Sequence, residues 1–188
     1  MYAVNICFTF TDKLNQILNE LNKNINSIIH FDNTHLPHIT LLQFYTSKKN
    51  INNIKYILNH INYDFTQFII NKLKIIKYKE LNIYTLNFEN NDIISFQNKI
   101  INIFKKFIEI NNFNNNNFIE NITYEPLHDI VKNYYKNIYL PHITFAISKN
   151  EYEIDFNEII INNSDIKLEL LFIGEYGTAI PIHNVNTL

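Results

Sequence analysis

Hydrophobic and polar positions alternate over residues 2–10, and the pattern then changes to a helical one. Alternation with a period of two is typical of a β-strand that buries one face. Thr11 follows as a candidate N-cap, and apolar residues then recur at helical spacing from Leu14 to Ile28. The start of the chain therefore predicts a strand followed by a helix.

Strand and helix patterns are intermixed over the rest of the chain. Strands are expected at residues 36–44, 66–78, 82–88, 139–147 and 166–174, and helices at residues 50–62 and 90–108. The second of these helices has Asn90 as its candidate cap, and residues 126–137 fit neither pattern clearly. Because hairpins and crossovers both occur, the expected class is α+β.

Length and composition set limits on the kind of protein. The chain has 188 residues, of which 46% are hydrophobic, and a formal net charge of -2. These values predict one domain over residues 1–188. No stretch reaches the roughly 18 apolar residues of a membrane span, and no secretory signal is visible, so we expect no membrane partner and a cytoplasmic location. The single Cys7 lies in the first expected strand, where a buried thiol is expected.

The basic residues also limit the choice of partner. All of the 16 basic residues are Lys. Without Arg, bidentate guanidinium contacts to phosphate are unavailable, and Lys, hydroxyls and backbone N–H groups must hold any anion. A sequence pI near 6.4 argues against binding of long nucleic acid. A small nucleotide or a terminal phosphate is the better expectation, whereas the oligomeric state is left open.

The sequence Leu-Pro-His-Ile-Thr occurs twice, at residues 36–40 and 140–144. In an extended strand His and Thr project from the same face and the Ile between them turns to the other face. A single copy would be read as an ordinary half-buried strand with polar residues on its outer face. Two identical copies predict an internal repeat, in which each half offers one imidazole beside one hydroxyl.

These pairs suit phosphodiester cleavage. One group must remove a proton from the nucleophile and another must supply a proton to the leaving oxygen, and two imidazoles with pKa values near 6.5 can do both. The hydroxyls of Thr40 and Thr144 can donate hydrogen bonds to the non-bridging phosphate oxygens. A metal site is not expected, because His35 and His38 would point to opposite faces of a strand and one Cys offers no thiolate set. No cofactor is expected either.

The two motifs resemble those of the 2H phosphoesterase superfamily, the LigT-like proteins, which carry two His-x-Thr/Ser-x motifs about a hundred positions apart. Here the motifs begin at His38 and His142. The resemblance implies a bilobal α+β fold, in which two pseudo-symmetric lobes with central antiparallel sheets surround a shared cleft. It also implies that His38 and His142 are the catalytic acid and base and that Thr40 and Thr144 bind the phosphate. It does not say which His is the base.

Members of that superfamily act on RNA ends and RNA-derived nucleotides, and a short member with A/T-rich codon usage resembles the viral ones, including those of poxviruses. The implied function is a metal-independent phosphodiesterase, a hydrolase that cleaves 2'-5' phosphodiester bonds in nucleotide second messengers and so counters innate immune signalling in the host cytoplasm. The first choice of substrate is 2',3'-cGAMP. The alternatives are 2'-5' oligoadenylate, RNA ends with a 2',3'-cyclic phosphate, and a non-catalytic protein that binds nucleotides or RNA ends.

Three aromatic residues are further candidates for substrate binding. Phe44 and Tyr45 lie just past the first motif, and strict alternation places Phe44 on the face of His38. Tyr176 follows the last strand and could stack on a base, although an ordinary turn aromatic fits the same position. The densest group of lysines, residues 72–79, is read as the solvated edge of a hairpin.

Overall fold

The computed structural model describes residues 1–65, 67–88, 90–109, 115–136 and 139–182, and it confirms the α+β class. The strands are β1 (Tyr2–Phe10), β2 (His38–Thr46), β3 (Phe68–Ile70), β4 (Lys72–Tyr78), β5 (Leu81–Asn87), β6 (His142–Ser148), β7 (Ile159–Ile161), β8 (Ile166–Ile173) and β9 (Ala179–Ile180). The α-helices are α1 (Asp12–Lys23), α2 (Lys48–Leu58), α3 (Asn91–Phe104) and α4 (Pro126–Asn133). None of the described helices is long and apolar enough to cross a membrane.

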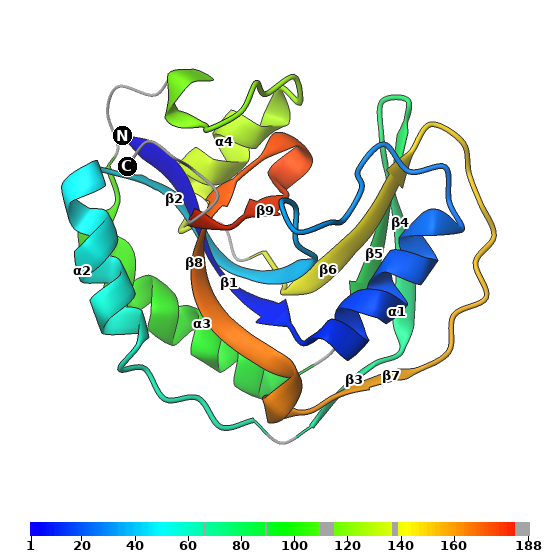
Figure 1. Cartoon of the computed structure of the whole chain (residues 1–188), viewed down its shortest axis with the longest axis horizontal. Coiled ribbons are helices and arrows are strands. Elements are labelled where there is room, and N and C mark those ends of the chain that lie inside the picture. The colour runs from blue at the N-terminus through cyan, green and yellow to red at the C-terminus, as the bar shows by residue number, and fades with distance from the viewer. Residues whose placement is uncertain (66, 89, 110–114, 137–138, 183–188) are drawn as a thin grey trace.

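The motif strands belong to separate antiparallel sheets. One sheet has the order β2-β1-β8-β9 and contains the first motif, and another has the order β4-β5-β6 and contains the second. A short pairing of β3 with β7 lies at the base of the molecule (Figure 1). In both views the motif strands β2 and β6 lie at the inner edges of their sheets, next to each other.

The repeat in the sequence is also a repeat in the fold. The unit β1-α1-β2 is an antiparallel strand pair with a helix in its connection, and β5 and β6 form an antiparallel pair whose connection contains α3 and then α4. A further antiparallel strand extends each pair on the side away from the motif, β8 beside β1 and β4 beside β5. The strand pairing around the two motifs is therefore similar, as an internal repeat predicts.

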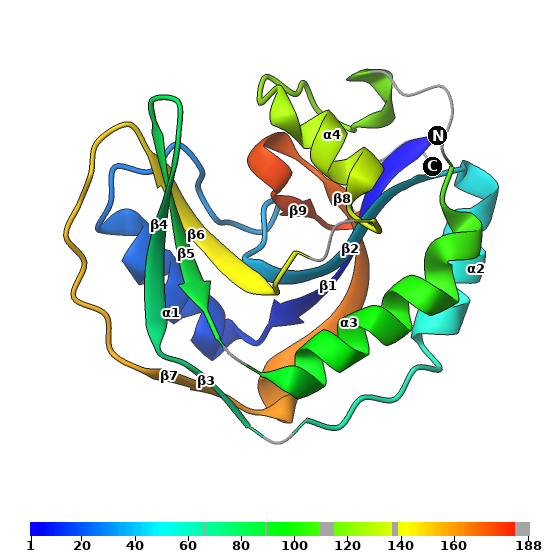
Figure 2. The same cartoon turned by 180° about the vertical axis from the view of Figure 1, so that it is seen from behind.

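The helices of the two units are exchanged between the sheets. Helix α1 follows β1 but contacts β6, whereas α3 follows β5 but contacts β2 (Figures 1 and 2). One core cluster contains buried residues of both sheets, among them Phe8 of β1 and Phe145 of β6. The two sheets are thus joined by a common apolar core as well as by their connections.

Helix α1 ends at Lys23, although the apolar spacing continues to Ile28. The buried Asn22 amide donates hydrogen bonds to the carbonyls of Ile29 and Phe145, at 3.0 and 2.8 Å. The N–H of Ile28 donates to the carbonyl of Ile147 at 2.7 Å. The chain therefore leaves the helix to satisfy backbone groups beside β6, a tertiary contact that outweighs helical periodicity.

Candidate active site

Each motif histidine is oriented by the backbone just before it. Nδ1 of His38 lies 3.0 Å from the carbonyl oxygen of Leu36, and Nδ1 of His142 lies 2.9 Å from that of Leu140. A carbonyl oxygen only accepts, so Nδ1 carries the hydrogen in both rings and Nε2 is the nitrogen left for proton transfer. The same local hydrogen bond thus sets the same tautomer in both halves.

A β-bulge follows each motif and changes which side chains face inward. Ile6 pairs with Leu42 and Cys7 with Thr40, so that β2 has one extra residue, Leu41. The partners of β5 likewise skip Phe145 in β6. Since a bulge reverses the alternation beyond it, the residue five positions after each motif His shares its face, which places Gln43 and Ile147 at the site.

The bulge makes the prediction for Phe44 wrong. Strict alternation placed Phe44 on the face of His38, but its side chain is fully buried in the core on the opposite face, with Ile39 and Leu42. Tyr45 is on the motif face, yet it too is buried, against Phe118. Its hydroxyl lies 3.0 Å from Nδ1 of His128, so this side chain supports the cavity wall and does not line the cavity.

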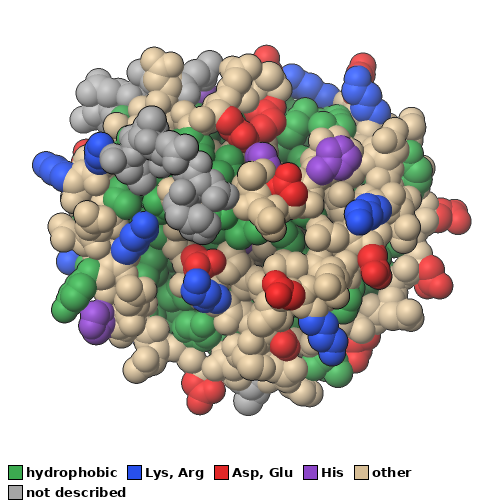
Figure 3. All heavy atoms as spheres, in the orientation of Figure 1, with side chains coloured by type: hydrophobic (Ala, Val, Ile, Leu, Met, Phe, Trp, Pro, Cys, Tyr) green, Lys and Arg blue, Asp and Glu red, His purple; other side chains and the backbone are tan. Residues whose placement is uncertain are grey.

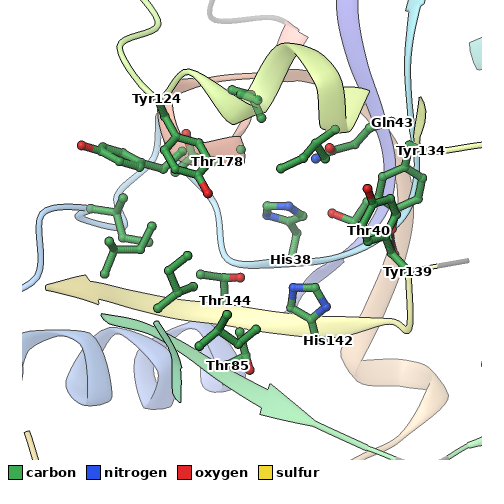
Figure 4. A pocket seen from close by; sticks show the side chains of 18 of the residues that line it. His38, Thr40, Gln43, Thr85, Tyr124, Tyr134, Tyr139, His142, Thr144 and Thr178 are labelled. Carbon is green, nitrogen blue, oxygen red and sulfur yellow. Dashed lines mark hydrogen bonds between the residues drawn. The ribbon is translucent and has the colours of Figure 1, made fainter. Parts of the chain in front are cut away.

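The two motifs meet at one cavity of about 190 Å³, which we call the histidine cavity (Figure 4). Both motif His and both motif Thr line it, together with Gln43, Thr85, Tyr124, Leu127, Tyr134, Tyr139, Ile147, Tyr176, Gly177, Thr178 and several further apolar residues. The close-up shows the rings of His38 and His142 next to each other at its centre. The structure therefore brings together all four residues that the repeat singles out.

Burial lowers the pKa of both imidazoles. Desolvation is the main cause for each, and it outweighs the opposite effect of the hydrogen bond from Nδ1 to the carbonyl. The pKa of His38 falls to about 4, and the charge of the neighbouring His142 contributes to that shift. At neutral pH the unliganded site therefore holds two neutral rings.

The two threonines differ in their surroundings. Oγ1 of Thr40 accepts a hydrogen bond from the buried Asn5 amide at 3.3 Å, so its own hydrogen stays available for donation into the cavity. Thr144 lines the same cavity from β6. Both hydroxyls can thus donate hydrogen bonds to the oxygens of a phosphate, as the motif predicts.

No lysine lines the histidine cavity within the described part of the chain. An anion bound there must take its hydrogen bonds from hydroxyls and the Gln43 amide, and its counter-charge from a protonated imidazole. Among the same described residues, no three His, Cys, Asp or Glu side chains come together as potential metal ligands. The donor set at the cavity is therefore one for proton transfer and anion binding.

Tyr176 does line the histidine cavity, as the third aromatic candidate should. It lies in a turn, Glu175–Gly177, with a positive φ of 56°. The carboxylate of Glu175 accepts hydrogen bonds from the N–H groups of Thr123 and Tyr124 at 2.8 and 3.0 Å, and also from the hydroxyl of Thr123. The rings of Tyr124 and Tyr176 are consequently held in contact, with centroids 5.3 Å apart.

Sequence reasoning missed several residues of the cavity wall. Gln43 could have been found only by anticipating the bulge, which depends on pairing with β1. Thr85, Tyr124, Tyr134, Tyr139 and Thr178 come from segments outside the motifs. Tyr134 also braces the first motif, because its hydroxyl donates to the backbone carbonyl of Thr40 at 3.4 Å. Neither periodicity nor spacing marks these residues.

Comparisons of the chain with protein-family models, with curated proteins and with solved structures gave no match.

Proposed function

We propose that this protein is a metal-independent phosphodiesterase of the 2H type, with the bilobal LigT-like arrangement that the resemblance implies. One observation carries the proposal. Two identical His-Ile-Thr segments, on adjacent edge strands of separate sheets, line one cavity, and Nδ1 of each His is hydrogen-bonded to a backbone carbonyl. Each Nε2 is thus left to exchange protons, as a reaction with one acid and one base requires.

The preferred reaction is cleavage of a 2'-5' phosphodiester bond. One imidazole removes the proton from the free 3'-hydroxyl, whose oxygen then bonds to phosphorus. The bond from phosphorus to the 5'-oxygen breaks, and the other imidazole donates a proton to that oxygen. The products are a 2',3'-cyclic phosphate and a free 5'-hydroxyl, and the adjacent position of the nucleophile makes the first step intramolecular.

The pKa shifts suggest how the roles divide. In the singly protonated site we place the proton on His142, because its charge is one of the causes that lower the pKa of His38 to about 4. We therefore assign His38 as the general base and His142 as the general acid of the cleavage step. Thr40 and Thr144 donate hydrogen bonds to the non-bridging oxygens.

A small nucleotide suits the surface better than a long nucleic acid. On the face shown in Figure 3, lysine side chains are dispersed among acidic ones and form no continuous stripe. A phosphate-backbone binder would need such a stripe. Tyrosine rings at the histidine cavity offer stacking surfaces for a base. We propose 2',3'-cGAMP as the first substrate, a role in countering host nucleotide signalling, and 2'-5' oligoadenylate as the second candidate.

The test is chromatographic. Purified protein is incubated with 2',3'-cGAMP, its all-3'-5' isomer and 2'-5' triadenylate, each in the presence of EDTA. The parallel sample is the double variant His38→Ala/His142→Ala, and His60→Ala is the matched control because His60 is exposed on the surface, where its Nδ1 contacts the carbonyl of Tyr56.

Loss of a 2'-5'-linked compound with wild type and His60→Ala, but not with the double variant, is the expected result. Loss of RNA-end substrates alone would move the proposal to 2',3'-cyclic phosphate chemistry. Binding without turnover of any of these compounds would favour the non-catalytic alternative.

A further inference from the structure

A second pocket lies next to the histidine cavity and shares two lining residues with it. It is lined by Tyr78, Lys79, Glu80, Leu81, Thr123, Tyr124, Glu125, Pro126, Lys149 and Tyr176, and we call it the hairpin pocket because it includes the tip of the β4–β5 hairpin. Tyr124 and Tyr176 line both spaces. A ligand that passes these two rings on leaving the histidine cavity therefore enters the hairpin pocket.

The sizes of the two spaces indicate that a ligand uses both. The histidine cavity encloses about 190 Å³, which is less than the roughly 300–1,000 Å³ of small-molecule sites. The hairpin pocket has about 370 Å³ and is the more open of the two. A substrate with its phosphodiester at the two His rings would thus extend beyond the histidine cavity, and the hairpin pocket is adjacent.

The wall of the hairpin pocket is a row of aromatic rings. Tyr78 meets Tyr124 edge to face with ring centroids 5.5 Å apart, and Tyr124 meets Tyr176 at 5.3 Å. All three side chains are half-buried, so part of each ring remains accessible. Such a row offers flat apolar surface on which a planar nucleobase can stack.

The backbone at this wall is held in an uncommon conformation. Within the described residues, the non-glycine residues with positive φ are Lys79, at 51°, and Tyr176, at 56°, and both line the hairpin pocket. Such conformations cost free energy and concentrate at functional sites. Glu175 holds the Tyr176 turn against Thr123 and Tyr124 by the hydrogen bonds described above. The aromatic wall is therefore preorganised.

Charges at the hairpin pocket are balanced. Lys79 and Lys149 are offset by Glu80 and Glu125, and Nζ of Lys79 lies 3.0 Å from Oε2 of Glu125. A second phosphate would meet as many carboxylates as ammonium groups there, whereas a neutral base would find stacking surfaces together with hydrogen-bond donors and acceptors. The chemistry of the pocket thus favours the base and ribose of a nucleoside over a phosphate group.

We infer that the hairpin pocket is the subsite for the second nucleoside of the substrate, with its base against the tyrosine row. This inference rests on the proposed function, because it places the scissile phosphate at the motif histidines. It narrows the substrate class to compounds with a nucleoside on each side of the phosphodiester, and it assigns Tyr78, which lies outside the histidine cavity, to recognition of the second nucleoside.

The test compares a substrate that has a second nucleoside with one that lacks it. For wild type and variants, kcat/KM is measured on 2'-5'-linked diadenylate and on adenosine 2',3'-cyclic monophosphate. Tyr78→Ala is expected to lower the ratio of kcat/KM on the diadenylate to kcat/KM on the cyclic monophosphate by roughly 5- to 150-fold, the range for loss of one base-stacking contact. Tyr78→Phe keeps the ring and the wild-type ratio. Tyr56→Ala, which removes a tyrosine that is 68% exposed on α2, is the matched control.

An unchanged ratio in Tyr78→Ala, with a wild-type circular dichroism spectrum, would overturn the inference. If wild type cleaves neither of these compounds nor 2',3'-cGAMP, the proposed function fails, and calorimetric titration of the diadenylate and the cyclic monophosphate into wild type and Tyr78→Ala then decides the subsite separately. If Tyr78→Ala binds the diadenylate more weakly than wild type does, but binds the cyclic monophosphate equally well, the subsite is supported. Equal binding by both proteins, or no binding, would overturn it.

Discussion

At the scale of single residues, His38 and His142 make equivalent hydrogen bonds, so the proposed assignment of base and acid needs a kinetic test. If His142 is the acid, a leaving group that needs no proton makes it dispensable. We expect His142→Ala to lose roughly 100- to 10,000-fold in kcat on a 2'-5' dinucleotide but far less on a nucleoside 2'-(p-nitrophenyl phosphate). His38→Ala should be impaired on both, because the nucleophile still requires deprotonation. Steady-state rates on the two substrates, with His60→Ala as control, measure this.

Equal rescue of both variants by the better leaving group would contradict the assignment. Rescue of His38→Ala alone would reverse it. In either case His38 and His142 would remain the proposed proton-transfer pair, because these results bear only on which of them is the acid and which the base.

The lowered pKa values predict an acidic optimum for kcat/KM. In the free protein both rings are neutral at pH 7, whereas the reaction needs one protonated ring. As the pH falls below the ordinary value of about 6.5, His142 gains its proton and activity should rise. It should fall again as His38 protonates near pH 4. The profile of kcat should lie at higher pH, because a bound phosphate stabilises an imidazolium in a cavity lined by no described lysine.

The measurement is the pH dependence of both parameters on one substrate. The two apparent pKa values in such a profile describe the interacting pair of histidines and not each ring separately. An optimum of kcat/KM above pH 7 would contradict the prediction. Neither the direction nor the cause of these shifts could be predicted from the sequence, because they arise from burial by segments that contain no motif.

Residue chemistry at the motifs was otherwise predictable from the sequence. Alternation placed each His and its Thr on one face, and the structure brings both pairs to one cavity. The same rule failed at Phe44, three residues beyond the bulged Leu41. A bulge depends on the register with a neighbouring strand, so local alternation holds only as far as the first irregularity.

At the scale of elements, two helix starts that look alike in the sequence differ in the structure. The side chain of Asn90 accepts hydrogen bonds from the N–H groups of Asp92 and Ile93, at 2.8 and 3.1 Å, at the start of α3. Thr11 occupies the equivalent position of α1, but its side chain makes no capping hydrogen bond. Both were predicted as caps, and only Asn90 makes the interaction.

This difference predicts a difference in stability. Asn90→Ala should lower the free energy of unfolding by about 0.5–2 kcal/mol, the usual cost of losing a cap. Thr11→Ala should cost much less, since no described capping bond is lost. Urea unfolding followed by circular dichroism measures both. Equal losses in the two variants would show that cap geometry does not decide the stability of these helices.

At the scale of the whole molecule, each of the two motif sheets is contacted by a helix that follows a strand of the other sheet in the chain. Helix α1 contacts β6, and α3 contacts β2. The sequence predicted both helices and the repeat, but it could not predict this exchange, because periodicity says which face of a helix is apolar and not which sheet covers it. The short strand β7 was missed for a related reason, since it exists only through its pairing with the distant strand β3. Strand β9 was missed because it is only two residues long.

The exchange predicts that the two sheets unfold together. Removing either sheet would expose the apolar face of a helix that belongs to the other sheet, and the common core cluster contains both Phe8 and Phe145. Calorimetry should therefore give one transition whose calorimetric and van't Hoff enthalpies agree. Phe145→Ala, which empties a fully buried position in β6, should lower the stability of the entire molecule by about 3–5 kcal/mol. It should shift the single transition to lower temperature, whereas Tyr56→Ala at the surface should leave it in place. A variant transition that splits in two, with the part from the first sheet unmoved, would show that the two halves of the repeat fold independently despite their exchanged helices.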